Sequence, residues 1–568
     1  MGVGRRRRAG PYQAFHAAAD VQGHLAADRP VAGTARASMT GRWGQMRQTT
    51  TVEVRLDESN ATSSNAARRA TRRFGREQRR LQSNETDNHA HRPWHLGDVS
   101  SMMRRREFIQ AGPAALLVND ALGPFSLEKE GALSAFPPGF VWGVSSSALQ
   151  IEGALDEDGR GPSIWDQTKG GDPPRGPEPA AGHYHRWPDD ILLLQNLGVA
   201  AYRFSVAWPR VLPEGAGTVN QKGLDFYDRL VDGLLSAGLT PWVCLHHWDL
   251  PAPLQKVGGW IRRETADRFL EYVLVVAGCI GDRIHHWIPL NEPNVVSYGG
   301  YGVGVYPPGH MNEEFFFDSV HHQNLAQGLA LKALAGRDRF VGSVLSISPV
   351  RPASSRPQDI AAAELHDLIY HRAFLDPLLG HGYPEALALR MAPLVRPGDL
   401  EVIAHRPDFL GLNYYGPTYR QAWPGAPFSN DGNVTPAHVP MTSENSPIDS
   451  QGLFEVLCNI RDRYGRPPVV ITENGLPGSD VVGTDGRIDD DERIRFLRSH
   501  LLAVEKALTA GCDLRGYFVW SFLDSWEWTW GYDQRFGLVY VDFDTGARIP
   551  KSSFGWYRSV SRSNQVRP

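Results

Sequence analysis

The feature that most constrains the fold of this chain is a regular alternation of short apolar runs with longer segments of helical spacing. Eight mostly apolar runs recur in order, over residues 140–145, 201–207, 240–246, 284–290, 340–347, 409–415, 468–472 and 514–521. Such runs are typical of parallel strands whose two faces are both covered. Intervening segments such as 264–281 and 492–510 repeat apolar residues at helical spacing. The alternation predicts α/β architecture, and eight βα units predict a closed (β/α)8 barrel, the TIM barrel, with long βα loops.

Polar and aromatic residues follow seven of the eight predicted strands. In chain order they occupy the segments 149–153, 208–210, 246–249, 291–293, 413–415, 473–475 and 520–524. Barrels of this kind build their sites at the C-terminal ends of the strands, where the βα loops meet. The sequence therefore predicts a single catalytic domain over residues 136–558, with one site at that face.

Two glutamates stand at these strand ends, Glu292 after the fourth strand and Glu473 after the seventh, and each has an asparagine as its neighbour. A single glutamate at a barrel rim is more often a salt-bridge partner. A facing pair in different surroundings can instead act as acid and nucleophile, the division of labour found in glycoside hydrolysis. Metal binding is the alternative, but no H-x-x-E-H, H-E-x-x-H or compact Asp cluster accompanies the pair. We expect no metal ion and no cofactor.

The aromatic residues near these strand ends suit a sugar. A pyranose ring has apolar faces and a rim of hydroxyls. A site for it therefore needs flat aromatic side chains and polar side chains that can each form two hydrogen bonds. Tryptophan clusters are more often core, but the segment Trp526-Glu527-Trp528-Thr529-Trp530 places a carboxylate among the rings, which argues against simple burial. The platform and polar candidates are Trp248, Trp520, Trp526, Trp528 and Trp530, with Gln150, His247, Asn291 and Glu527.

Taken in order, these motifs resemble glycoside hydrolase family 1, the β-glucosidase family, over residues 136–557. A single such motif would be weak, but the whole series in the family's order makes the resemblance specific. The matching stretches are Phe140-Val141-Trp142-Gly143, Gln150-Ile151-Glu152-Gly153, Tyr202-Arg203-Phe204-Ser205-Val206-Ala207-Trp208, His247-Trp248-Asp249-Leu250-Pro251, Asn291-Glu292-Pro293, Asn413-Tyr414-Tyr415, Ile471-Thr472-Glu473-Asn474-Gly475 and Arg535-Phe536-Gly537-Leu538.

The resemblance implies a role for each site residue. Glu292 becomes the general acid/base and Glu473 the nucleophile of a reaction with net retention, for which the two carboxyls must lie about 5–5.5 Å apart. Arg203 is implied to keep the nucleophile ionised, with Tyr415 donating to it and Asn413 supporting the site. The residues implied to bind the sugar are Gln150, His247, Trp248, Asn291, Tyr415, Trp520, Glu527 and Trp528.

The activity that the resemblance implies is that of an exo-acting β-glucosidase, with small β-glucosides and β-linked disaccharides as substrates. Glu527 favours neutral sugars, because the branch of the family acting on 6-phosphorylated sugars replaces this glutamate. Three alternatives stay open: β-galactosidase or β-fucosidase activity, transglycosylation, and a catalytically dead barrel that binds sugar. Loss of either Glu292 or Glu473 would have favoured the catalytically dead barrel, and both glutamates are present.

Two positions depart from the family pattern. Leu149 replaces a tyrosine before Gln150, and Asn294 replaces an aromatic residue after the Asn-Glu-Pro triplet. We expect both departures to alter the leaving-group side of the site rather than the reaction.

The N-terminal residues differ from the rest in charge. Residues 1–106 hold 20 Arg, no Lys and 9 Asp or Glu, a net charge of +11, which leaves −15 for the remaining 462 residues of a chain whose total is −4. The polar composition of residues 1–101 predicts a disordered, solvated leader or a non-native extension. The alternative is a nucleic-acid arm, but no aromatic or folded element accompanies the arginines, so we expect no nucleic-acid partner.

Residues 102–135 carry Arg104-Arg105-Arg106-Glu107-Phe108-Ile109 before a short apolar stretch, a pattern that resembles a twin-arginine export signal. The early break at Asn119-Asp120 and the lack of an Ala-x-Ala cleavage site count against it. We expect export only if translation starts at Met102 or Met103. If translation starts elsewhere, we expect a cytoplasmic protein. Residues 559–568 are predicted to be a tail. The sequence contains no run of 18 apolar residues, so we expect no membrane-spanning helix. Its four cysteines are widely dispersed, which argues against a disulfide scaffold and against a zinc ribbon.

Overall fold

The computed structural model describes residues 135–566, except 172, 427, 429–430 and 443–446. The predicted leader, residues 1–101, lies outside the described residues, and so does the candidate signal segment 102–135 apart from Ala135. Within the described part of the chain, no helix combines the length and the apolar character needed to cross a bilayer.

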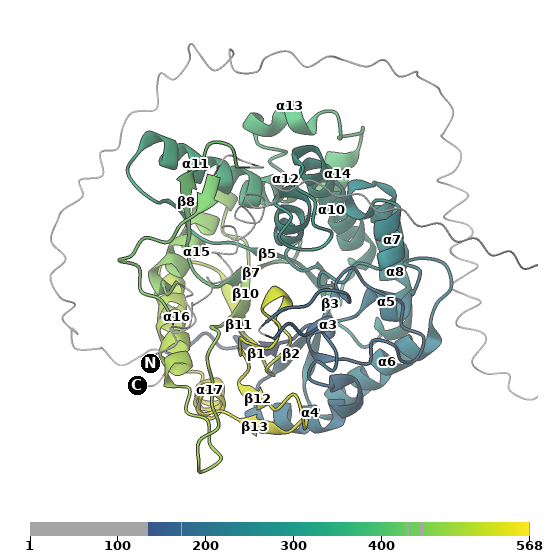
Figure 1. The fold of residues 1–568 in the computed structure, drawn as a ribbon, viewed down its shortest axis with the longest axis vertical. Helices are drawn as coiled ribbons and strands as arrows, with labels where there is room; N and C mark the ends of the chain where they lie inside the picture. Colours follow the sequence, from purple (N-terminus) through teal and green to yellow (C-terminus); the bar gives the residue numbers. More distant parts are fainter. Residues whose placement is uncertain (1–134, 172, 427, 429–430, 443–446, 567–568) are drawn as a thin grey trace, which may run out of the picture. The chain divides into compact units, whose positions relative to one another are not determined.

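Eight parallel strands close into a barrel, which confirms the predicted fold (Figure 1). Each strand pairs in parallel with the next around the ring, and β1 closes the ring against the last strand. All eight predicted runs coincide with barrel strands to within two residues at each end. In ring order the strands are β1 (Val141–Ser145), β11 (Leu514–Trp520), β10 (Val469–Asn474), β7 (Phe409–Tyr414), β5 (Phe340–Ser346), β4 (His286–Leu290), β3 (Thr240–His246) and β2 (Ala201–Ser205).

Long helices surround the barrel, as Figure 1 shows. They are α4 (His183–Leu197), α6 (Gln221–Ser236), α8 (Glu264–Ile280), α10 (Glu313–Leu334), α15 (Ser450–Tyr464), α16 (Asp491–Thr509) and α17 (Ser552–Ser563). Shorter α-helices lie in the loops, namely α3 (Ala148–Ile151), α5 (Trp208–Val211), α7 (Ala252–Lys256), α9 (Pro293–Val295), α11 (Pro357–Asp367), α12 (Ala373–Leu378), α13 (Ala388–Met391) and α14 (Asp399–Ile403). The described residues also form 3₁₀ segments, η5 (Gly259–Ile261), η8 (Glu385–Leu387) and η9 (Trp528–Trp530), and π segments, η6 (Val296–Gly302) and η7 (Leu368–Arg372).

Local sequence signals explain where two of the long helices begin. Asn312 caps α10 by accepting a hydrogen bond from the Phe315 amide at 3.0 Å, and Asp449 caps α15 by accepting one from the Gly452 amide at 2.8 Å. Such caps satisfy amides that have no partner inside the helix and stabilise it by about 1 kcal/mol each.

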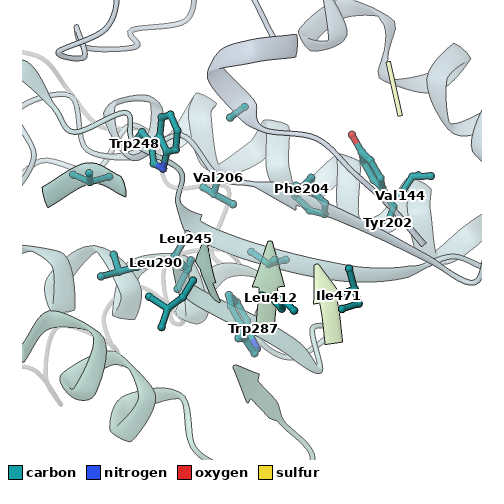
Figure 2. Packing of buried hydrophobic residues seen from close by; sticks show 14 of the residues in the cluster. Val144, Tyr202, Phe204, Val206, Leu245, Trp248, Trp287, Leu290, Leu412 and Ile471 are labelled. Atoms are coloured by element: carbon teal, nitrogen blue, oxygen red, sulfur yellow. The ribbon is translucent and has the colours of Figure 1, made fainter. Parts of the chain in front are cut away.

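The core has two parts, because strand side chains alternate between the inside and the outside of the barrel. Inside lies a cluster of Ala201, Trp242, Cys244, Ile288, Val344, Phe409, Val470 and Phe518. Between strands and helices lies a larger cluster, part of which Figure 2 shows, including Tyr202, Phe204, Leu245, Trp287 and Leu412. In β2, therefore, Tyr202 and Phe204 pack outward, while Arg203 between them projects the other way, toward the barrel axis. Cys244 is buried in the inner cluster, and burial raises the pKa of its thiol to about 12.

Two small sheets in the loops were not predicted, because strands of three to five residues show too little alternation to be recognised. One contains β6 (Val350–Pro352), β8 (Thr418–Ala422) and β9 (Asp431–Asn433), and the other pairs β12 (Val539–Val541) with β13 (Arg548–Pro550).

The predicted C-terminal boundary at residue 558 was wrong. Helix α17 continues to Ser563, and Val566 is only 1% exposed. Between them, the Asn564 side chain donates to the Phe136 carbonyl at 2.6 Å, and the Phe136 amide donates to the Asn564 carbonyl at 2.9 Å. Residues 559–566 therefore belong to the folded domain, whose first and last segments hydrogen-bond to each other.

Candidate active site

A cavity of about 380 Å³ opens at the C-terminal ends of the barrel strands, and most of the predicted site residues line it. These are His247, Trp248, Glu292, Tyr415, Glu473, Trp520, Glu527 and Trp528. The other predicted residues, Gln150, Arg203, Asn291 and Asn413, are buried behind this lining. These twelve residues thus come to one place, although they are spread over nearly 400 positions of the chain. Of the other platform candidates, Trp530 lines the cavity, whereas Trp526 is fully buried and does not.

Glu473 lies in β10, at a β-bulge where the register with β7 shifts between Ile471 and Glu473. Bulges re-aim side chains, and this one accompanies a carboxylate that faces the cavity. Arg203 donates to one carboxylate oxygen at 2.6 Å and Tyr415 donates to the other at 2.6 Å. Burial raises the pKa of this carboxyl, while the Arg203 charge and the Tyr415 hydroxyl act in the opposite direction. Both oxygens are therefore held by donors that favour the ionised form.

Glu292 follows β4 in a left-handed conformation, with φ of 49° and ψ of 56°. Its amide donates to the Val344 carbonyl at 3.0 Å, which ties this turn to β5. A non-glycine residue in that conformation costs on the order of 1 kcal/mol or more, so the surrounding structure must hold it. Burial, together with the nearby charge of Glu473, raises the pKa of Glu292 to about 8. At neutral pH this carboxyl is protonated and can act as an acid.

A relay of side-chain amides connects the two carboxyls. Arg203 donates to the Asn291 carbonyl oxygen at 2.6 Å while it also holds Glu473. Asn413 donates to the same oxygen of Asn291 at 3.1 Å. The Asn291 amide nitrogen is thereby left to face Glu292, at 3.3 Å from Oε2, and His247, at 3.1 Å from Nε2. One guanidinium thus orients groups on both sides of the cavity.

The rings around the cavity form stacked pairs. Trp248 stacks on Trp528 with ring centroids 4.4 Å apart, and His247 stacks on Trp520 at 5.5 Å. Burial and the Arg203 charge lower the pKa of His247 far below its ordinary value, so this imidazole is neutral and offers one donor and one acceptor. The rings supply the flat apolar surface that a pyranose face requires.

Glu527 is a third buried carboxyl at this cavity. The Ser525 hydroxyl donates to Oε1 at 2.7 Å, and both Ser525 and Gln150 act to lower the pKa of this carboxyl. Burial raises the pKa of Glu527 to about 8. At neutral pH Glu527 is therefore largely protonated, so it can donate to a sugar hydroxyl as well as accept from one.

The structure also brings residues to the site that sequence reasoning missed. The one predicted strand end without an apparent motif is that of β5, and it contributes Ser346 to the cavity, while Tyr306 contributes a ring from the loop after η6. A lone serine at the end of a strand has no distinguishing spacing. Leu149 and Asn294, expected to alter the leaving-group side, are both buried, and neither lines the cavity, so any influence on that side is indirect.

Among the described residues, no group of three or more His, Cys, Asp or Glu side chains is arranged to hold a metal ion. The arrangement combines two buried carboxyls in an aromatic-walled pocket, one held by a guanidinium and a phenolic hydroxyl and the other with its pKa raised to about 8. Such a pair can act as nucleophile and acid.

Comparisons with known proteins agree with this geometry. The model of glycosyl hydrolase family 1 matches residues 132–566. β-Glucosidase A of Thermotoga maritima is 42% identical over 443 residues, which are 76% of this chain and 98% of that protein. A bifunctional β-D-glucosidase/β-D-fucosidase of Bifidobacterium breve is also 42% identical, over 76% of this chain and 99% of that protein.

Solved structures lead to the same family. The β-glucosidase from Thermotoga maritima in complex with deoxynojirimycin has a TM-score of 0.72 at 40% identity, and covers 76% of this chain and 100% of its own. A psychrophilic β-glucosidase from Micrococcus antarcticus has a TM-score of 0.72 at 38% identity, and covers 76% of this chain and 98% of its own. The resemblance inferred from the motifs is thereby confirmed.

Proposed function

The chain belongs to glycosyl hydrolase family 1, and we propose that it is a retaining, exo-acting β-glucosidase that removes terminal non-reducing β-D-glucosyl residues from small β-glucosides and β-linked disaccharides. The observation that carries this proposal is the pair of buried carboxyls in one cavity. Glu473 is held by Arg203 and Tyr415, whereas the pKa of Glu292 is raised to about 8. The relatives named as β-glucosidases supply the sugar and the linkage.

In the first step, Glu473 attacks the anomeric carbon of the bound glucosyl unit. Arg203 and Tyr415 keep this carboxylate ionised and in place. Glu292 gives its proton to the glycosidic oxygen as the bond to the leaving group breaks, so the aglycone departs as a neutral alcohol. The glucosyl unit is then an ester of Glu473.

In the second step, Glu292 is the base. Esterification removes the negative charge of Glu473, and with it one cause of the raised pKa of Glu292, so Glu292 can remain ionised after the proton has left. It takes a proton from water, the water oxygen attacks the anomeric carbon from the face that the aglycone left, and Glu473 is released as a carboxylate. Two inversions at one carbon give net retention.

The cavity and the residues behind it fit a neutral hexose. His247 and Glu527 in the lining, with Asn291 and Gln150 behind it, supply hydrogen-bonding groups, and the paired tryptophans supply the apolar surface. A β-fucosidase side activity is a second candidate, because the relative from Bifidobacterium breve is named for both activities.

Purified protein tested on aryl β-glucosides, β-galactosides and β-fucosides and on cellobiose checks the proposal. We expect the β-glucoside and cellobiose to be hydrolysed, and proton NMR during the reaction to show the β-anomer of glucose as the first product. First appearance of the α-anomer would contradict the retaining mechanism. Transfer to added alcohols at the expense of hydrolysis would instead favour a transglycosidase.

For the N-terminal region, we propose export by a twin-arginine route when translation begins at Met102 or Met103. The support is the Arg104-Arg105-Arg106 segment followed by Phe108-Ile109 and a short apolar stretch. Mass spectrometry of the N-terminus in culture fluid and in cell extract tests it. A protein that begins at Met102 or Met103 and stays uncleaved in the cell extract would contradict it.

A further inference from the structure

The turn that carries Glu292 is joined to β5 by few main-chain contacts. Strand β4 pairs with β5 at its N-terminal end, where His286 lies opposite Phe340 and Trp287 opposite Val341. Higher up, an isolated bridge joins Asn291 to Val344, and the Glu292 amide donates to the Val344 carbonyl at 3.0 Å. At Glu292 the main chain turns into its left-handed conformation and leaves the strand direction. Main-chain pairing with β5 therefore stops at the residue whose side chain faces the cavity.

The side chain of Asn294 continues the pairing two residues further on. Its amide nitrogen donates to the Ser346 carbonyl at 2.7 Å, and its carbonyl oxygen accepts from the Ser346 amide at 3.3 Å. This is the two-bond pattern that one peptide group makes with another, supplied here by a primary amide. Asn294 is 0% exposed, so both of its hydrogen-bonding groups need partners inside the protein. The last residue of β5 is thereby held against the first turn after Glu292.

Ser346 joins this clamp to the carboxyl. It lines the cavity together with Glu292, and its hydroxyl acts to lower the pKa of the Glu292 carboxyl, as a donor to the ionised form does. On its other side Ser346 lies opposite Asn413 of β7, so its main chain is fixed from two directions. The main chain that carries this hydroxyl is therefore fixed relative to the turn at Glu292.

We propose that Asn294 and Ser346 are positioning residues for Glu292: the amide of Asn294 holds the end of β5 against the turn, and the Ser346 hydroxyl orients the carboxyl in the cavity. The inference rests on the proposed role of Glu292 as acid/base. It also gives Asn294, which stands where the family has an aromatic residue, a role of its own. The Asn294 side chain binds the main chain of Ser346 rather than a ligand.

The effect of the pair on Glu292 must be separated from that of its other neighbours. Titratable and charged groups face Glu292 from several elements of the site: Arg203 on β2, His247 after β3, Tyr306 after η6, Tyr415 after β7 and Glu473 on β10. None of these changes in a Ser346→Ala variant, which removes one hydroxyl and leaves both main-chain hydrogen bonds to Asn294 in place.

The test follows Glu292 directly, by carbon-13 NMR of protein labelled at the glutamate side-chain carboxyls. Exposed glutamates titrate near 4.3, so a resonance that titrates near 8 and disappears in Glu292→Gln belongs to Glu292. We expect Ser346→Ala and Asn294→Ala to raise its titration midpoint by roughly half to one pH unit, because each removes or loosens a hydrogen bond to the ionised form. Ser346→Thr, which keeps the hydroxyl, should restore the wild-type midpoint.

Ser343→Ala is the matched control. Ser343 is a buried serine of the same strand whose hydroxyl has no hydrogen-bond partner among the described residues, so the midpoint should stay unchanged. An unchanged midpoint in both Ser346→Ala and Asn294→Ala would overturn the proposal. If Asn294→Ala does not fold, as judged by circular dichroism, Ser346→Ala carries the test alone.

Kinetics provide the second readout. We expect Asn294→Ala to lower kcat/KM for cellobiose, a poor leaving group, about tenfold more than kcat/KM for an activated aryl β-glucoside, because only the former needs the proton of Glu292. Equal slowing of both substrates, with an unchanged midpoint, would mean a merely structural role. The titration needs no turnover and can be measured whether or not the protein hydrolyses glucosides. Wild-type protein without glucosidase activity would therefore refute the proposed function, while the titration would still decide whether Asn294 and Ser346 position Glu292.

Discussion

The ends of β4 and β10 each bring one glutamate to the same cavity, and their surroundings differ. Glu473 receives a guanidinium and a phenolic hydroxyl at 2.6 Å each, while Glu292 has an amide at 3.3 Å as its nearest side-chain donor. The exposed fractions of the two residues are close, 2% for Glu473 and 5% for Glu292. Burial alone therefore does not distinguish the two carboxyls, whereas the contacts of Glu473 with Arg203 and Tyr415 do.

The main-chain conformations of the two glutamates also differ. Glu473 lies within a strand, beside a bulge that shifts its register with β7, whereas Glu292 lies beyond its strand in a left-handed turn. The main chain at Glu473, the proposed nucleophile, is held by pairing with β7 on both sides of the bulge. The main chain at Glu292, the proposed acid, depends on a turn that its neighbours must hold. Substitutions around the two glutamates should therefore have different consequences.

Replacing Glu473 by alanine should produce the largest effect. We expect turnover of an aryl β-glucoside to fall by at least about 10⁴-fold, because no nucleophile remains. Added azide should restore part of the rate and give the inverted α-glucosyl azide, identified by NMR. The retained β-azide from this variant would show that the roles of the two glutamates are exchanged.

Replacing Glu292 by alanine should produce a smaller and substrate-dependent effect. Hydrolysis of cellobiose should fall by about 10²–10⁴-fold, the usual contribution of acid/base catalysis. With an activated aryl β-glucoside, a burst of phenol release should precede slow turnover, because the ester of Glu473 forms without the acid and waits for the missing base. Azide should here yield the retained β-glucosyl azide. Undiminished cellobiose hydrolysis would rule Glu292 out as the acid.

The pH dependence provides a test without mutation. Because burial and the charge of Glu473 raise the pKa of Glu292 to about 8, the acid is protonated below that pH and lost above it. We expect kcat/KM for cellobiose to fall about tenfold for each pH unit above the alkaline limb. That limb should be absent in Glu292→Ala. A wild-type limb below pH 6 would mean that Glu292 is ionised in the free enzyme.

Removing the Tyr415 hydroxyl should have the smallest effect of the four. Tyr415→Phe leaves the Arg203 contact with Glu473 intact but removes the donor to the second oxygen. We expect kcat to fall about tenfold, the equivalent of one hydrogen bond to a charged group. The acidic limb should move to higher pH, because loss of the donor raises the pKa of Glu473. Tyr414→Phe is the control, since that hydroxyl donates to the Asp449 carbonyl instead. Equal pH profiles for Tyr415→Phe and wild type would contradict the role of the hydroxyl.

Much of the fold follows from local sequence pattern, because all eight barrel strands coincide with the apolar runs predicted for them. The five short strands and the continuation of α17 past residue 558 were not predicted. Three-residue strands carry too little periodicity, and the last segment is held by Asn564 and Val566, whose partners include Phe136 at the other end of the domain. No local pattern can report a contact across more than 400 residues.

The site residues at strand ends were predictable, since parallel strands bring their C-terminal ends to one face of a barrel whatever the loops contain. The identity of Glu292 and Glu473 as the two carboxyls was therefore determined by the sequence itself. Their states were decided by the tertiary structure, because a pKa depends on burial and on the distance to other charges, and Arg203 is 270 residues away from Glu473 in the chain. The same holds for Ser346 and Asn294, two ordinary polar residues whose significance arises only where β5 meets the turn after β4.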